Sequence, residues 1–83
     1  MYDFFVLPPA QKDLDRLEAS AFERILKKIR ALSKDARPPG CLKLTGDDGY
    51  RVRSGDYRLL YRADDSSRRI YIYRVKDRKD VYS

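Results

Sequence analysis

The 83-residue chain contains no histidine and a single cysteine, Cys41. With so few soft ligands it has no cluster typical of a zinc site, and we expect neither metal nor cofactor. One cysteine forms no internal disulfide, which is typical of a reducing cytoplasm. No apolar run approaches the roughly 20 residues of a membrane span, and the N-terminal segment lacks the basic flank of a signal peptide. We therefore expect a cytoplasmic protein without a membrane segment.

Positive charge is in excess: 19 Lys and Arg residues against 13 Asp and Glu residues give a formal net charge of +6. Most cations of the second half are arginines: Arg51, Arg53, Arg58, Arg62, Arg68, Arg69, Arg74 and Arg78. A cationic surface favours phosphate backbones, acidic proteins or anionic membranes. Arginine favours planar, bidentate recognition of phosphate. The alternative is a soluble basic surface with no specific partner.

The length and the apolar pattern predict one compact domain over residues 1–83. Tyr2–Leu7 is an aromatic-rich apolar run that stops at two prolines, which is typical of a strand. A first helix is expected next, because three apolar residues recur on one helical face: Ala10, Leu14 and Leu17.

A second helix is expected from Ser20, which forms a capping box with Glu23 three residues later. Its apolar stripe consists of Phe22, Ile25, Leu26, Ile29 and Leu32. The helix is expected to end at residues 37–40, which contain two prolines and a glycine. The result is a helical hairpin.

After Gly40 the apolar period changes to two, which predicts strands. Three are expected, at residues 50–53, 57–61 and 70–75. A strand, two helices and three strands predict an α+β fold, with the helices on one face of a mostly antiparallel sheet.

The turn between the first two of these strands decides where the arginines lie. If Gly55-Asp56 is a two-residue turn, Arg53 lies opposite Arg58, and cross-strand partners share a face. One face then carries Tyr50, Val52, Tyr57, Leu59 and Tyr61, and the other carries Arg51, Arg53 and Arg58. Like charges opposite one another destabilise a sheet, so a bound polyanion is a good reason for them. A turn one residue longer removes this register, and a solvated face is the alternative.

Tyr71 and Tyr73 alternate with Ile70 and Ile72, so one pair is expected to face away from the core. Stacking on an RNA base is one interpretation of such a tyrosine, and covering the sheet surface is the other.

Three stretches together resemble the RelE family of toxins, whose superfamily also includes the ParE-type gyrase poisons. They are residues 42–46, residues 50–61 and the segment Arg78-Lys79-Asp80-Val81-Tyr82. The resemblance covers nearly the whole chain and implies a single RelE-like domain. It also implies the toxin of a type II toxin–antitoxin system, a ribosome-dependent endoribonuclease that cleaves mRNA in the ribosomal A site and inhibits translation.

The same resemblance implies the site residues and the partners. Catalytic roles fall on Arg51, Arg53, Arg58, Arg78 and Tyr82, and RNA-binding roles on Lys43, Lys76, Lys79 and Tyr73. The implied partners are an acidic antitoxin, mRNA and the 16S rRNA of the A site, with the free toxin a monomer. The chain departs from the family pattern at three places: the hairpin positions hold arginine rather than lysine, Asp77 replaces a frequent histidine, and Thr45 replaces a basic residue.

The implied reaction is attack of a ribose 2′-hydroxyl on the adjacent phosphate, which needs no metal. The arginines supply charge, but arginine is a poor base. Proton transfer is left to Asp77, Lys79, Tyr82 or the ribosome. Two other functions remain open: a ParE-type inhibitor of DNA gyrase without ribonuclease activity, and a non-enzymatic RNA-binding module.

Overall fold

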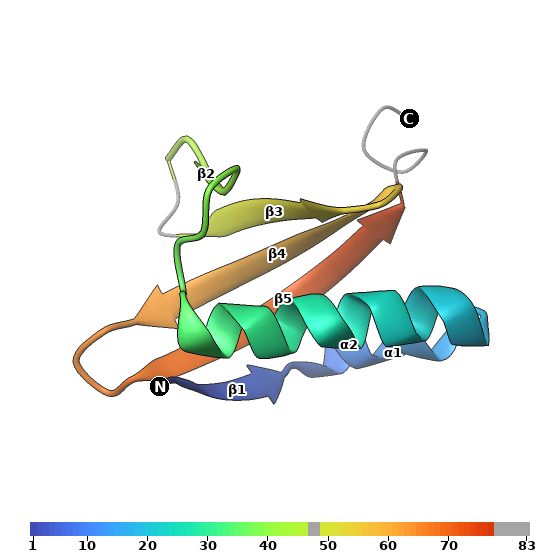
Figure 1. The fold of residues 1–83 in the computed structure, drawn as a ribbon, viewed down its shortest axis with the longest axis horizontal. Coiled ribbons are helices and arrows are strands. Elements are labelled where there is room, and N and C mark those ends of the chain that lie inside the picture. The colour runs from blue at the N-terminus through green and yellow to red at the C-terminus, as the bar shows by residue number, and fades with distance from the viewer. Residues whose placement is uncertain (47–48, 78–83) are drawn as a thin grey trace.

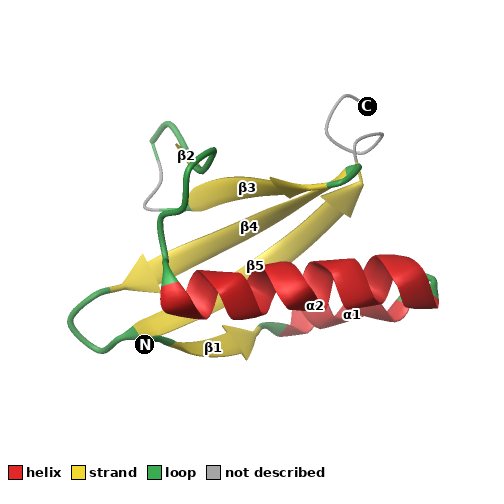
Figure 2. Cartoon of the chain, in the orientation of Figure 1, coloured by secondary structure: helices red, strands yellow, loops and turns green. Residues whose placement is uncertain are grey.

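The structure, a computed structural model, describes residues 1–46 and 49–77. Helices α1 (Pro8–Asp15) and α2 (Ala19–Lys34) lie on one face of a five-stranded sheet (Figures 1 and 2). The strands are β1 (Asp3–Val6), β2 (Leu42–Lys43), β3 (Tyr50–Ser54), β4 (Tyr57–Asp64) and β5 (Arg69–Asp77). Their order is β1-β5-β4-β3-β2, with β1 parallel to β5 and the other pairs antiparallel. The predicted α+β fold is confirmed, with the two-residue strand β2 as an addition.

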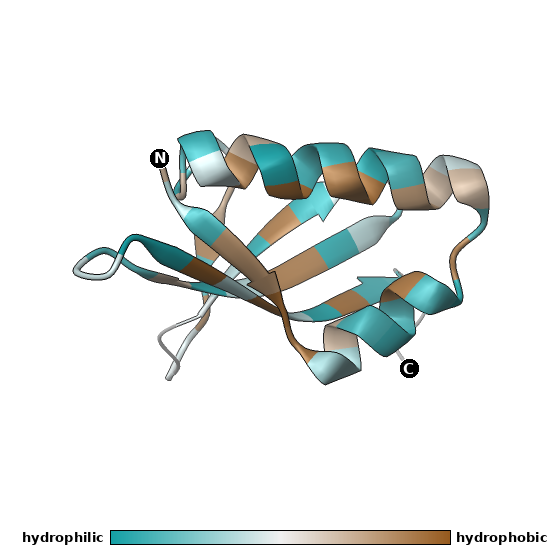
Figure 3. Cartoon of the chain, turned by 90° about the horizontal axis from the view of Figure 1, so that it is seen from below, coloured by the Kyte–Doolittle hydropathy of each residue, from teal (hydrophilic) through white to brown (hydrophobic). Residues whose placement is uncertain are grey.

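The core lies between α2 and the sheet. Ile25, Ile29 and Leu32 of the predicted stripe are fully buried, and they pack with Leu59 and Ile72 of the sheet. Figure 3 shows the apolar residues of α2 on its sheet-facing side. Burying each such side chain stabilises the fold by about 1.5–3 kcal/mol, so this stripe is what holds α2 in place.

The predicted capping box at the start of α2 is wrong. The helix begins at Ala19 with Glu18 as its N-cap residue, so Ser20 already lies inside the first turn. The Ser20 hydroxyl donates to the Glu18 carboxylate at 3.1 Å instead of capping a backbone amide. The other end also differs, because α2 stops at Lys34, before the prolines that were expected to end it.

The predicted β3–β4 hairpin is confirmed residue by residue. Gly55 and Asp56 form a two-residue turn, Arg53 pairs with Arg58, and Val52 pairs with Leu59. Gly55 has φ +60°, a left-handed conformation that glycine adopts without strain. The register therefore puts the tyrosines on the helix-facing side and the arginines on the open side of the sheet.

Tyr61 ties the centre of the sheet to the segment after α2. Its side chain is fully buried, and its hydroxyl donates to the Ala36 carbonyl at 2.6 Å. Burial raises the pKa of the Tyr61 phenol above its usual value, so the hydroxyl keeps its proton and remains a donor.

A register shift in β5 displaces one residue from the pairing. Leu60 pairs with Arg74 and Tyr61 pairs with Ile72, so Tyr73 is an extra residue on β5. Such a bulge bends the strand and re-aims its side chains. Ile70 and Ile72 are fully buried, which confirms that Tyr71 belongs to the pair facing away from the core.

Helix α1 covers the part of β5 that extends beyond β1. The Asp13 carboxylate accepts from the Val75 backbone amide at 2.8 Å and from Arg74 Nε at 2.9 Å and Nη2 at 3.2 Å. Asp13 thereby provides an acceptor for an edge amide that β1 is too short to reach. Within the described residues, neither helix has the length and apolar character needed to cross a membrane.

Candidate functional site

Three cations form a line across the open face of the sheet. Arg53 of β3 pairs with Arg58 of β4, and Arg58 pairs with Lys76 of β5. Directly opposite residues share a face, with Cβ atoms about 4.5–5.5 Å apart. We call Arg53, Arg58 and Lys76 the cationic row. It gathers residues from three strands, and two of its members come from one hairpin.

Arg51 joins this region from the next position along the open face of β3. Together with Arg53, Arg58, Gly40 and Leu42 it lines a hollow of about 280 Å³, here called the arginine hollow. Arg53 is exposed and Arg51 half-buried, whereas Arg58 is only 6% exposed. The alternative of a wholly solvated arginine face is therefore wrong for Arg58. A guanidinium held in place beside other cations is suited to binding a phosphate bidentately.

The structure brings together only part of the residues predicted for the site. Arg51, Arg53 and Arg58 line one hollow, and Lys76 lies in the same row. The predicted residues Arg78, Lys79 and Tyr82 lie outside the described residues. Lys43 and Tyr73 do not line the arginine hollow; they line a second pocket.

Asp77, one of the groups left open for proton transfer, pairs with Tyr57 at the end of β5. Tyr57 packs against the core beside Leu59 and Tyr61. Because cross-strand partners share a face, the register puts Asp77 on the helix-facing side, opposite to the cationic row.

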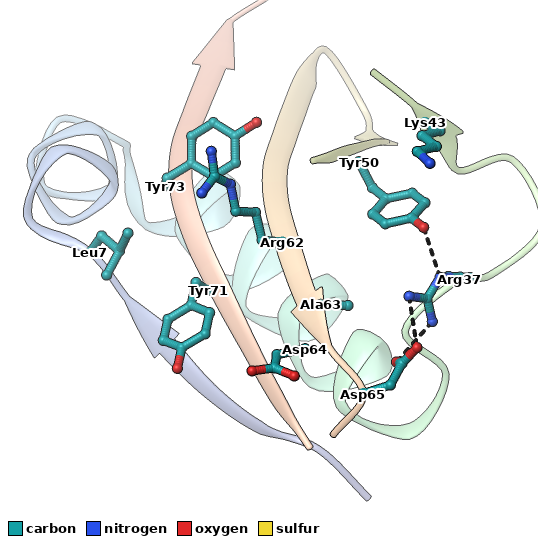
Figure 4. Close-up of a pocket in the computed structure, with 10 residues that line it drawn as sticks. All are labelled: Leu7, Arg37, Lys43, Tyr50, Arg62, Ala63, Asp64, Asp65, Tyr71 and Tyr73. Atoms are coloured by element: carbon teal, nitrogen blue, oxygen red, sulfur yellow. Dashed lines mark hydrogen bonds and ion pairs between the residues drawn. The ribbon is translucent and has the colours of Figure 1, made fainter. Parts of the chain in front are cut away.

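The second pocket, of about 830 Å³, is here called the tyrosine pocket (Figure 4). Its lining residues are Leu7, Arg37, Lys43, Tyr50, Arg62, Ala63, Asp64, Asp65, Tyr71 and Tyr73. Arg62 lies with its guanidinium carbon 5.8 Å from the centre of the Tyr73 ring. Tyr71 stacks on Phe5 of β1 with ring centres 5.7 Å apart. Aromatic rings and cations thus alternate across this part of the sheet, a combination that suits nucleobases and phosphates.

A network of polar side chains closes one side of the tyrosine pocket. Arg37 donates to both carboxylate oxygens of Asp65, at 3.0 and 3.1 Å, and its Nε donates to the Tyr50 hydroxyl at 3.0 Å. The Tyr2 hydroxyl donates to the same carboxylate at 2.6 Å. Hydrogen bonds from Arg37 and Tyr2 lower the pKa of Asp65, so this carboxylate stays ionised at neutral pH.

Two groups of pocket residues were not predicted from the sequence. Arg62 and Asp64 follow Arg58 along β4 at the strand period of two, so the sequence alone carried a signal for their shared face. For the pair Arg37 and Asp65 there was no such signal, because the two residues meet only through the packing of α2 beside the β4–β5 turn.

Solved structures place this fold in a class of small toxins. The chain superposes on the RelBE2 toxin–antitoxin complex of Mycobacterium tuberculosis with TM-score 0.83 and 26% identity, covering 92% of this chain and 96% of that one. It superposes on the RelE–RelB complex of Pyrococcus horikoshii with TM-score 0.82 and 31% identity, covering 93% of this chain and 94% of that one. It superposes on isolated Escherichia coli RelE with TM-score 0.81 and 25% identity, covering 99% of this chain and 92% of that one.

Residues 5–82 match the family described as ParE toxin of type II toxin-antitoxin system, parDE. The chain therefore belongs to the RelE/ParE superfamily and is a toxin of a type II toxin–antitoxin system. None of the curated proteins compared with the chain matches it.

Proposed function

We propose that this toxin is a ribosome-dependent endoribonuclease of the RelE type, which cleaves mRNA in the ribosomal A site and so inhibits translation. The observation that carries the proposal is the cationic row beside the arginine hollow. Placing Arg53, Arg58 and Lys76 next to one another costs stability, and a polyanion bound across them offsets that cost. RNA is such a polyanion.

In the proposed reaction a ribose 2′-oxygen attacks the adjacent phosphorus, and the bond from phosphorus to the 5′-oxygen breaks. The products are a 2′,3′-cyclic phosphate and a 5′-hydroxyl. Arg51, Arg53 and Arg58 stabilise the extra negative charge of the phosphorane, and Lys76 holds a neighbouring phosphate. Losing one such donor typically lowers the rate by about 10²–10³-fold.

Proton transfer is the demanding part of this reaction. The guanidinium of arginine stays protonated near neutral pH, so arginine does not act as a base there. The strand register argues against Asp77, whose cross-strand partner Tyr57 lies on the helix-facing side. We assign the task to Lys79 and Tyr82 together with ribosomal groups, and Arg78 to the leaving oxygen. Such an enzyme is slow on free RNA, because the ribosome supplies the alignment of the 2′-oxygen.

The proposed partners follow from charge and from the similar structures. The related RelE chains of M. tuberculosis and P. horikoshii were solved as toxin–antitoxin complexes. We propose that an acidic antitoxin likewise binds this toxin and covers its cationic face, and that the free toxin is a cytoplasmic monomer that needs no metal. On the ribosome the same face contacts mRNA and 16S rRNA.

A second candidate function is inhibition of DNA gyrase, because the family that matches residues 5–82 is described by ParE toxins. A gyrase inhibitor binds a protein and has no need of several cations around one phosphate. The arginine hollow therefore favours the ribonuclease.

The deciding experiment is to induce the toxin in a bacterial host and map the 5′ ends of cellular mRNA. The wild type should produce new 5′ ends confined to translated codons. Arg58→Ala and Arg78→Ala should each lose these ends while still binding antitoxin. Growth arrest without such ends, accompanied by DNA damage, would instead support the gyrase reading.

The matched control is Arg30→Ala, which removes the same charge from an exposed position on α2. Arg30→Ala should cut mRNA like the wild type. Because Arg58 is buried, its variants also need a thermal melt, and Arg58→Lys separates loss of charge from loss of the planar guanidinium.

A further inference from the structure

The tyrosine pocket lies on the same face of β4 as the arginine hollow but at the other end of the strand. Arg58 and Arg62 are four residues apart on β4, which corresponds to about 13 Å along a strand. A single-stranded RNA with its reacting phosphate at Arg58 would therefore reach Arg62 with a flanking nucleotide. Arg62 and Lys43 supply positive charge in this pocket for the backbone of that nucleotide.

Tyr71 offers a stacking surface in the pocket. One side of its ring is covered by Phe5, with ring centres 5.7 Å apart and ring planes 23° from parallel. The residue also lines the pocket and is only half-buried. Phe5, its partner on β1, packs against one face of the ring, which restricts the ring before any ligand arrives. A fixed aromatic ring binds a base with little loss of conformational entropy.

Asp64 offers a hydrogen-bond acceptor beside this ring. Its Oδ1 atom accepts from the Ser66 amide at 3.1 Å, the Ser66 hydroxyl at 2.7 Å and the Ser67 amide at 3.3 Å. Asp64 is exposed, and a carboxylate has about four acceptor positions on its two oxygens. Hydrogen bonds from Ser66 and Ser67 lower the pKa of Asp64, so the carboxylate is ionised at neutral pH. The exposed carboxylate therefore keeps acceptor positions for a ligand.

The strand register brings the ring and the carboxylate within reach of one base. Tyr71 pairs with Arg62, so Asp64 is its diagonal neighbour on the same face, at about 7–8 Å. Figure 4 shows both side chains at the same end of the pocket. A base stacked on Tyr71 would direct its edge towards Asp64. A carboxylate accepts from an exocyclic amino group, such as that of cytosine, and repels the carbonyl oxygen that uracil carries at the same position.

We propose that the tyrosine pocket binds the base of a nucleotide that flanks the cleaved phosphate, stacks it on Tyr71 and selects an amino-bearing base through Asp64. This inference rests on the proposed ribonuclease function, and it makes Asp64 a specificity-determining residue. It distinguishes cytosine from uracil, two bases of the same size and similar stacking.

The test is a fluorescence-polarisation titration with labelled oligonucleotides of about five residues, all cytosine or all uracil, at low salt. Their 2′-O-methyl groups prevent cleavage, so binding is measured independently of catalysis. The wild type should bind the cytosine strand about fivefold more tightly, the lower end of what a hydrogen bond to a base edge contributes.

Two variants separate the roles. Asp64→Asn keeps the Oδ1 acceptor for Ser66 and Ser67 but puts an amide donor in place of Oδ2, so the preference should turn towards uracil. Tyr71→Ala should weaken both strands by about fivefold or more through loss of stacking, and Tyr71→Phe should restore them. The control is Asp15→Asn, which makes the same charge change at an exposed position on α1. It should leave the affinities for the cytosine strand and the uracil strand unchanged.

Equal affinity of the wild type for both strands, or an unchanged preference in Asp64→Asn, would overturn the proposal. So would a Tyr71→Ala variant that binds both strands normally but loses antitoxin binding, since the pocket would then be a protein-docking surface. The proposed function fails separately: cytosine preference that reverses in Asp64→Asn, without mRNA cuts in the host, would uphold the base site and reject the ribonuclease.

Discussion

Replacing Asp13 by alanine should lower the free energy of unfolding by about 2 kcal/mol. The Asp13 carboxylate is 13% exposed and accepts one hydrogen bond from the Val75 amide and two from Arg74. Hydrogen bonds to a charged group contribute about 1.5–3 kcal/mol. We take the lower part of this range because the Arg74 side chain is 43% exposed and its ion pair is screened by water.

The measurement is thermal unfolding of the purified protein, followed by circular dichroism. In a domain of this size a loss of about 2 kcal/mol lowers Tm by roughly 8–16 °C. Asp15→Ala is the matched control, since the Asp15 carboxylate accepts one bond from exposed Gln11 and should change stability by less than about 0.5 kcal/mol. Equal Tm values for the two variants would refute the claim that Asp13 secures the edge of β5.

The contribution of Asp13 should also depend on pH. Burial favours the neutral carboxyl, but the hydrogen bonds from Arg74 and Val75 outweigh burial, so the pKa of Asp13 lies below its ordinary value of 3.8. A carboxyl with a lowered pKa stabilises the fold above its unfolded pKa, and this contribution is lost as pH falls through the folded value. The difference in unfolding free energy between wild type and Asp13→Asn should be constant at neutral pH and shrink below about pH 4. A difference that persists into strong acid would contradict this reasoning.

Two further variants test the packing at the centre of the sheet, both by urea unfolding. A Cβ atom at Gly49 would lie 2.5 Å from the Tyr73 hydroxyl, so Gly49→Ala should cost about 1–3 kcal/mol, most of it recovered in the double variant with Tyr73→Phe. An equal loss in the single and double variants would argue against this contact. Tyr61→Phe removes the donor to the buried Ala36 carbonyl and should cost about 1–3 kcal/mol; full stability would mean that another group reaches this oxygen.

The parts of the fold that local physics decides could be predicted from the sequence. The stripe on α2 follows from helical periodicity, and Ile25 and Ile29 are fully buried as expected. The hairpin register follows from the turn, because Gly55 provides the left-handed residue that a two-residue connection needs. That register alone placed Arg53 opposite Arg58, which is the origin of the cationic row.

The features that depend on contacts between distant segments could not be predicted in this way. A period-two pattern does not reveal the register shift between Leu60 and Tyr61. It therefore does not reveal that Tyr73 is left out of the pairing between β4 and β5. The pairing of Lys43 with Tyr50 depends on how the chain returns after α2, so the sequence did not show that Lys43 lines the tyrosine pocket rather than the arginine hollow. At Ser20 the spacing was right for a capping box, but the helix begins one residue before it.

The residues that stabilise the fold and those of the cationic row occupy different places in the sheet. The hydrogen bond of Tyr61 stabilises the centre of the sheet from the helix-facing side. The hydrogen bonds of Asp13 and Arg37 stabilise its periphery. The cationic row instead gathers like charges, because each of its members lies opposite another cation. Charge gathered at a cost in stability is typical of a binding site rather than of a scaffold. The open face of β3, β4 and β5 is therefore the part of this toxin whose sequence is best explained by what it binds.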